Sequence, residues 1–209
     1  MQALTSATPK PLLEVNGKTL IEYQIIKLRD AGFLDIVINV AYLGQKIIDH
    51  LKFGHHLGVN IQYSYEGKEG IETGGGIRRA LSLLGEYFIV VNADVMTDFP
   101  YTVLNDVSLG ESLAYLVLVN NPKHNCTGDF GLSFGKVRSK SGNLSKNYTF
   151  SGIGLYSKAL FSSYESGNTF SLLSVLKPAI ELQKVLGDVY TKSWDDIGTP
   201  ERLQGIRRA

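Results

Sequence analysis

The sequence predicts an α/β fold: a Rossmann-like mixed, mainly parallel sheet with helices on both faces. Helical and strand-like patterns alternate over the first half of the chain. Such alternation builds right-handed crossovers between parallel strands. The 209 residues are 44% hydrophobic and 20% charged, as in an ordinary globular domain that buries a sizeable core. We therefore expect one domain spanning residues 1–209.

The elements of the first half follow from apolar spacing. Ile21, Ile25 and Leu28 recur at i, i+4 and i+7, which predicts an amphipathic helix over 19–31. Gly32 follows it as a C-terminal stop. The next expected elements are a strand over 36–40, a helix around 47–51, a strand over 60–65, a helix around 77–84 and a strand over 87–92.

The second half of the chain is less regular. Apolar runs separated by Gly, Ser, Asn and Lys predict three strands, over 113–119, 130–134 and 148–156. The polar stretch Gly135–Asn147 is typical of a loop. A helix is expected over 172–183, and Pro178 should kink it or mark a new start.

Composition narrows the possible partners and surroundings. A formal net charge of +1 gives no global attraction to nucleic acid or to a membrane surface, so we expect neither as a partner. The single cysteine, Cys126, excludes an internal disulfide framework and a multi-cysteine zinc site. There is no signal-peptide pattern, and no apolar run approaches about eighteen residues. A cytoplasmic protein is expected, with His55 and His56 as surface residues.

Two carboxylates stand at positions suited to a hard cation. In open α/β sheets, ligands bind beyond the carboxyl ends of the strands, and Asp94 follows the apolar run that ends at Asn92. Asp196 precedes a second candidate turn. Turn or cap formation is the alternative for Asp94, and Thr199 as the N-cap of a helix is the alternative around Asp196. Mg²⁺ takes carboxylate oxygens while keeping waters and substrate phosphates.

Two further segments suit a phosphate-bearing ligand. Three glycines in Glu72–Gly76 leave room for a flat base or a phosphate to approach backbone N–H groups, although a hinge is the commoner use of such a cluster. In Thr8–Leu12, two prolines stiffen a loop around Lys10. That lysine is either solvated in an extended turn or held as a point charge against phosphate.

Together these segments resemble the nucleotidylyltransferase superfamily that activates sugar 1-phosphates. The matching segments occur in family order over nearly the whole chain: Thr8–Leu12, Leu20–Tyr23, Glu72–Gly76, Asn92–Asp94, Phe150–Ile153 and Asp196–Thr199. Gly128–Leu132 and Tyr148–Gly152 most resemble the short N-acetylmuramate-1-phosphate uridylyltransferases of cell-wall recycling. Mannose-1-phosphate guanylyltransferases are near neighbours.

The resemblance implies a reaction between a nucleoside triphosphate, UTP being favoured, and a sugar 1-phosphate, N-acetylmuramate 1-phosphate being favoured. Asp94 and Asp196 would hold Mg²⁺, and Lys10 would contact phosphate. The nucleotide base would lie against Glu72, Thr73, Gly74 and Gly75, with Glu66 as a neighbour. The sugar side would be formed by Asn92, Asp129, Lys146 and Gly152. The family's usual Glu-Lys pair is Ser145–Lys146 here.

The resemblance also implies an element that is not found in the sequence. Family members begin with a strand and a glycine-rich loop that carries a basic residue, and here Met1 falls near the end of that loop. We expect this first strand and loop to be absent, which would leave strand edges unpaired. Two other functions stay open. One is a non-catalytic nucleotide-sugar binding protein; the other is a dinucleotide oxidoreductase, disfavoured because no G-x-G-x-x-G follows a strand.

Overall fold

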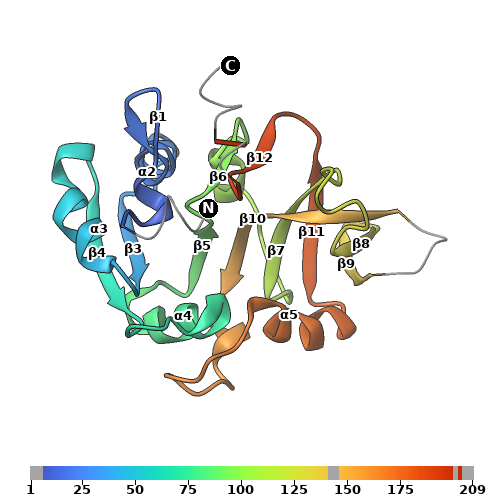
Figure 1. Ribbon diagram of the computed structural model, residues 1–209. Coiled ribbons are helices and arrows are strands. Elements are labelled where there is room, and N and C mark those ends of the chain that lie inside the picture. Colours follow the sequence, from blue (N-terminus) through green and yellow to red (C-terminus); the bar gives the residue numbers. More distant parts are fainter. Residues whose placement is uncertain (1–6, 141–145, 200–201, 204–209) are drawn as a thin grey trace.

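The computed structural model of the protein describes residues 7–140, 146–199 and 202–203 (Figure 1). Its α-helices are α2 (Leu20–Asp30), α3 (Gly44–Leu51), α4 (Glu72–Ala80) and α5 (Leu172–Glu181). Its strands are β1 (Glu14–Val15), β2 (Lys18–Thr19), β3 (Asp35–Val40), β4 (Asn60–Tyr65), β5 (Tyr87–Val91), β6 (Val95–Thr97), β7 (Ala114–Val119), β8 (Phe130–Ser133), β9 (Lys136–Ser139), β10 (Asn147–Ser157), β11 (Val185–Tyr190) and β12 (Trp194–Asp196). Short 3₁₀ helices are η1 (Lys10–Leu12), η2 (His55–Leu57), η3 (Leu81–Leu83), η4 (Tyr101–Asn105) and η5 (Lys158–Phe161).

Six strands form the central sheet, in the order β5-β10-β7-β11-β9-β8. The long strand β10 runs antiparallel to β5 and β7, and β7 is parallel to β11. The α/β class and the mixed sheet are confirmed, but the expectation of mainly parallel pairing needs correction. Among the described residues, only β7–β11 and β3–β4 pair in parallel. The reason is that strands of the second half reverse direction without a helical crossover.

Both faces of this sheet are covered, as predicted. On one face, Leu116 and Leu118 of β7 pack in a cluster with side chains of α4 and α5, which lie next to each other below the sheet (Figure 1). On the other face, Tyr115 and Val117 pack with the end of α2 and with η4. All six residues of β7 are buried, as its unbroken apolar sequence predicts.

Helix α5 continues through Pro178, so of the two expected outcomes there, a kink or a new start, the new start does not occur. Proline lacks the N–H that would bond the carbonyl oxygen four residues earlier, which belongs to Ser174. The Tyr164 hydroxyl donates to this oxygen at 3.4 Å. A side chain from outside the helix thus satisfies the acceptor that the proline leaves open.

The stretch Gly135–Asn147, expected to be a loop, contains strand β9. Phe134 and Gly135 have φ values of 48° and 71°, and they join β8 to β9 with Ser133 paired to Lys136. Positive φ at both residues of a two-residue turn is the pattern of a type I′ hairpin. The rest of the expected loop is only partly described, because residues 141–145 lie outside the described residues.

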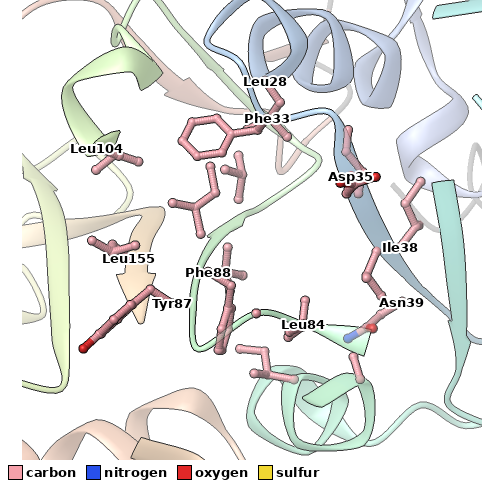
Figure 2. Close-up of a pocket in the computed structure, with 18 of the residues that line it drawn as sticks. Leu28, Phe33, Asp35, Ile38, Asn39, Leu84, Tyr87, Phe88, Leu104 and Leu155 are labelled. Carbon is pink, nitrogen blue, oxygen red and sulfur yellow. The ribbon is translucent and has the colours of Figure 1, made fainter. Parts of the chain in front are cut away.

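A cavity of about 1100 Å³ separates β3 from β5. Figure 2 shows Ile38 and Asn39 of β3 on one side of it and Tyr87 and Phe88 of β5 on the other. In the described chain β3 pairs with β4 alone and β5 with β10 alone, so each keeps one edge without a strand partner. The apolar centre of β3 is only half-buried as a result.

Three expectations about the surface can be compared with the structure. Cys126 is a free, exposed thiol, and His55 and His56 are exposed in η2. Among the helices in the described part of the chain, none combines the length and the apolar character needed to cross a bilayer.

Candidate active site

Lys10 lies in a segment whose backbone conformation is restricted by two prolines, and its side chain is paired with a carboxylate. Pro9 has extended backbone angles, φ −62° and ψ 141°, and Pro11 lies in the first turn of η1, so the backbone on both sides of Lys10 has little freedom. The Lys10 ammonium forms an ion pair with Asp94, and the two side chains are 29% and 27% exposed. The alternative of a fully solvated lysine is therefore not what the structure shows.

Asp94 and Asp196 meet where two short strands pair. In the antiparallel pair β6–β12, Val95 lies opposite Asp196. Ile197 N also donates a hydrogen bond to the Asp94 carbonyl oxygen at 2.8 Å. The backbones of the two predicted metal-binding residues thus lie side by side, although Asp94 and Asp196 are far apart in the sequence. Within the described residues, no group of three or more His, Cys, Asp or Glu side chains is placed to hold a metal ion.

Asp196 has two side-chain partners, a histidine and an arginine, that the sequence did not reveal. His124 Nε2 lies 3.0 Å from Asp196 Oδ1, and Arg202 forms an ion pair with the same oxygen. The neighbouring Asp195 experiences a different environment. Burial raises the pKa of the Asp195 carboxyl and the Asp196 charge adds to this, while Arg202 and His124 act in the opposite direction.

The backbone around Thr199 directs Arg202 toward Asp196. Arg202 N donates to Thr199 Oγ1 at 3.3 Å, and Leu203 N donates to the Thr199 carbonyl oxygen at 3.1 Å. Thr199 therefore acts as the predicted N-cap, although Pro200 and Glu201 lie outside the described residues. A Cβ at Gly198 would overlap the Arg202 guanidinium. The Arg202 side chain therefore passes directly over Gly198 on its way to Asp196.

A bulge in β10 places Asn92 and Gly152 beside this junction. The register of β10 against β7 shifts between Phe150 and Ile153, and Gly152 has φ 78°. Gly152 O accepts a hydrogen bond from Asn92 N at 3.0 Å, and a Cβ on Gly152 would lie 2.7 Å from Asn92 Nδ2. Trp194 of β12 donates from Nε1 to the Ser151 carbonyl oxygen at 3.0 Å. The bulge therefore connects the end of β5 to β12.

Asp129 and Lys146 have local partners in this structure. Asp129 accepts hydrogen bonds from Phe150 N at 2.8 Å and from Asn125 Nδ2 at 3.0 Å. It thereby anchors the loop before β8 onto β10. Lys146 is exposed and donates to Asn120 Oδ1 at 3.3 Å. The roles of Asp129 and Lys146 toward a sugar stay predictions.

The segment predicted to bind the base divides into two parts. Glu72 and Thr73 are exposed and line the cavity between β3 and β5, together with Glu66 and Asn92. Gly74 and Gly75 are buried, and a Cβ on either would lie within 3 Å of the 168–171 segment. In this structure these two glycines allow close packing of α4 against the start of α5, rather than facing the cavity.

Gly76 has a comparable packing role next to Glu66. A Cβ on Gly76 would overlap Glu66 Oε1 and would lie 2.6 Å from Asn39 Nδ2. Glu66 Oε2 accepts a hydrogen bond from Ile71 N at 3.2 Å. The polar groups of Asn39 and Glu66 therefore border the cavity just where α4 begins. Asn39 is a polar residue within the apolar strand β3, and this break in the apolar pattern is the signal by which the sequence marks it.

Comparison with known proteins identifies the family of the chain. The family model described as nucleotidyl transferase matches residues 1–133, a range that contains Lys10, Asp94 and the glycine cluster. The chain belongs to the nucleotidyl transferase family. The resemblance inferred from the sequence segments is therefore confirmed.

Relatives of this nucleotidyl transferase extend over almost its full length. N-acetylmuramate alpha-1-phosphate uridylyltransferase of Neisseria meningitidis serogroup B is 45% identical, over 98% of this chain and 90% of the relative. D-glycero-alpha-D-manno-heptose 1-phosphate guanylyltransferase of Campylobacter jejuni is 27% identical, over 96% and 90%. The structure of HddC from Yersinia pseudotuberculosis complexed with GMP-PN has a TM-score of 0.78 at 23% identity, covering 96% of this chain and 89% of that one. The last likeness concerns the fold alone.

The candidate site thus has two parts that meet at Asn92. One part is the carboxylate junction, with Lys10 on Asp94 and with His124 and Arg202 on Asp196. The other part is the cavity lined by Glu66, Glu72 and Thr73. Asn92 lines the cavity and precedes Asp94 by two residues, so the two parts are continuous along the chain.

Proposed function

We propose that this chain joins a nucleoside triphosphate to a sugar 1-phosphate, with UTP and N-acetylmuramate 1-phosphate as substrates and pyrophosphate as the second product. The observation that carries the proposal is the β6–β12 junction, which sets Asp94 and its partner Lys10 beside Asp196. The choice of substrates is supported by the relative at 45% identity, whose name states that activity. A cytoplasmic location and a role in cell-wall recycling are part of the same proposal.

Mg²⁺ is the cofactor that suits the donors at the junction. Two carboxylates supply hard oxygen ligands, and Mg²⁺ is usually held by one or two carboxylates together with substrate phosphates and waters. Asp94 and Asp196 would hold the ion. When bound, Mg²⁺ would neutralise charge that develops on phosphate oxygens during the reaction.

The residues of the chain act mainly by positioning the substrates and by stabilising charge. An oxygen of the sugar phosphate attacks the α-phosphorus, and the bond from that phosphorus to the bridging oxygen breaks with its electron pair leaving on pyrophosphate. No general base is needed, because a phosphate monoester is largely ionised at pH 7. Lys10 adds a positive charge beside the phosphates. Glu72 and Thr73 contact the base, while Asn92 and Gly152 face the sugar.

A donor and acceptor panel tests the proposal. Pyrophosphate release is measured for UTP and GTP, each with N-acetylmuramate 1-phosphate, mannose 1-phosphate and a heptose 1-phosphate. We expect the fastest turnover with UTP and N-acetylmuramate 1-phosphate, and turnover should cease when EDTA removes divalent ions. Faster turnover with GTP would contradict the choice of base.

A guanylyltransferase is the second candidate function, because the Campylobacter jejuni relative aligns over nearly the whole chain. GTP preferred with either mannose 1-phosphate or the heptose 1-phosphate would favour it. A third outcome, nucleotide-sugar binding without pyrophosphate release from any pair, would instead indicate a non-catalytic binding protein.

A further inference from the structure

We propose that Arg202 and His124 form the binding site for the phosphate of the sugar 1-phosphate, and that they turn from Asp196 to this phosphate when a divalent cation takes Asp196. This inference rests on the proposed function and concerns the same site. The starting observation is that the two residues, 78 positions apart in sequence, converge on one carboxylate oxygen.

Both side chains are positioned by hydrogen-bonded backbone segments. Arg202 is directed by the Thr199 cap and passes over Gly198, where a Cβ would overlap its present guanidinium position. His124 lies in a loop whose next residue, Asn125, donates to Asp129 Oδ1 at 3.0 Å and to Thr149 Oγ1 at 3.2 Å. The loop and the cap therefore place the His124 and Arg202 side chains next to each other.

The charges at this place favour an anion once a metal is bound. Arg202 is always positive, and its planar fork matches the oxygens of a phosphate. The Arg202 side chain is 24% exposed, so water screens its charge less than at an open surface. A divalent cation on Asp196 would remove the present partner of Arg202 and His124, and it would repel the Arg202 guanidinium. Phosphate oxygens that arrive with the metal offer them new acceptors.

The position of His124 assigns this phosphate to the sugar rather than to the nucleotide. Its loop connects β7 to β8 and is anchored to β10 by Asp129, on the side of the junction where Trp194 donates to the carbonyl oxygen of Ser151, the residue before Gly152. Lys10, the cation on the other carboxylate, lies in the N-terminal segment. Lys10 on Asp94 and Arg202 on Asp196 thus provide two separate positive charges, one for each of the two phosphorylated substrates.

The test compares Arg202→Met and His124→Gln with Lys123→Met, which removes a neighbouring exposed positive charge and serves as the matched control. Loss of a charge-assisted hydrogen bond changes an equilibrium by about tenfold to a hundredfold. We expect KM for N-acetylmuramate 1-phosphate to rise by this factor in the first two variants, with KM for UTP within about twofold. Arg202→Lys should be intermediate, because it keeps the charge and loses the fork.

Direct binding separates this inference from the proposed function. Calorimetry with Mg²⁺ measures binding of N-acetylmuramate 1-phosphate, and of inorganic phosphate as a probe without sugar, to the wild-type chain and to each variant. Weaker binding of both ligands in Arg202→Met and His124→Gln supports the inference even if no pyrophosphate is released. Equal losses for UTP and the sugar phosphate would overturn it. Unchanged binding and kinetics with only a lower Tm would also overturn it, since the pair would then be structural.

Discussion

At the scale of single residues, the site consists of carboxylates whose charges are balanced from different parts of the chain. Asp94 has Lys10, and Asp196 has Arg202 and His124. Partly exposed ion pairs of this kind stabilise a fold by only about 0–1 kcal/mol each. Their arrangement therefore bears more on ligand binding than on the stability of the protein.

Asp94→Asn and Asp196→Asn should each lower the rate of pyrophosphate release by about 10²–10³, the usual effect of losing one preorganised charge-stabilising group. The Tm should fall by no more than about 2–4 °C, corresponding to about 1 kcal/mol. Asp106→Asn, which changes an exposed aspartate outside the site, is the control. A variant that keeps wild-type turnover would remove that residue from the metal site.

The bulge of β10 tolerates an added side chain poorly at Gly152. Gly152→Ala would force a Cβ onto φ 78° and against Asn92, and such backbone strain costs about 1–3 kcal/mol. We expect a lower Tm and a raised KM for the sugar 1-phosphate. Gly131→Ala in the same sheet is the matched control, because its Cβ would meet no atom closer than 3.5 Å. Equal effects of the two substitutions would show that the bulge has no special role.

At the scale of elements, helix α2 begins with a reciprocal capping box. Glu22 N donates to Thr19 Oγ1 at 3.4 Å, and Glu22 Oε2 accepts from Thr19 N at 2.7 Å. His50 Nε2 lies 3.2 Å from Glu22 Oε1. Burial alone would raise the pKa of Glu22, but the hydrogen bonds from Thr19 and the proximity of His50 hold it below the ordinary value.

Glu22→Gln should therefore destabilise the protein in a pH-dependent way. A carboxyl whose pKa is lowered on folding stabilises the fold above its unfolded pKa, about 4.3, and this contribution is lost as pH falls through the folded pKa. We expect a loss of about 1 kcal/mol at pH 7 in urea unfolding. The difference from wild type should shrink at pH 3, and a constant difference would contradict this explanation.

Elements were predictable where the signal is local. The strand expected over 60–65 matches β4, and the helix expected over 19–31 contains α2, because apolar spacing within one segment reports its own buried face. The β1–β2 hairpin was missed although Asn16 and Gly17 are a turn signal; their φ values are 47° and 80°.

Features that depend on contacts between distant segments were not predictable in this way. β12 has three residues and no periodicity, and it exists through its pairing with β6. The same holds for the site. Asp94, Asp196 and Lys10 were named from local sequence, whereas His124 and Arg202 have no local mark and are recognised only by what they contact.

At the scale of the whole molecule, the cavity between β3 and β5 separates strands that would otherwise form one continuous sheet. Both bordering strands have the near-continuous apolar sequences of centrally placed strands, yet each has an edge without a strand partner in the described chain. Unpaired backbone groups beside a cavity must bond to water instead. This is the place where an additional strand would be accommodated.

Extending the chain upstream of Met1 should raise both Tm and turnover. The extension would have about fifteen residues and would consist of an apolar strand followed by a glycine-rich loop with one basic residue. These lengths follow from typical strands and loops. The strand would pair the open edges, and the loop would add N–H donors for the triphosphate; one such donor is typically worth about 10²–10³ in rate. A glycine-serine extension of equal length is the control. Equal Tm and turnover with both extensions would contradict the explanation.

The same cavity divides the molecule into regions that need not open together. Side chains of β3, α3 and β4 pack in a cluster with α2, separate from the two clusters on the faces of the central sheet. Segments with few shared contacts open as independent cooperative units. We expect backbone amides of residues 36–65 to exchange with deuterium through a low-energy opening, whereas those of β7 and β10 exchange only on global unfolding. Uniform protection across both regions would show that the gap does not uncouple them.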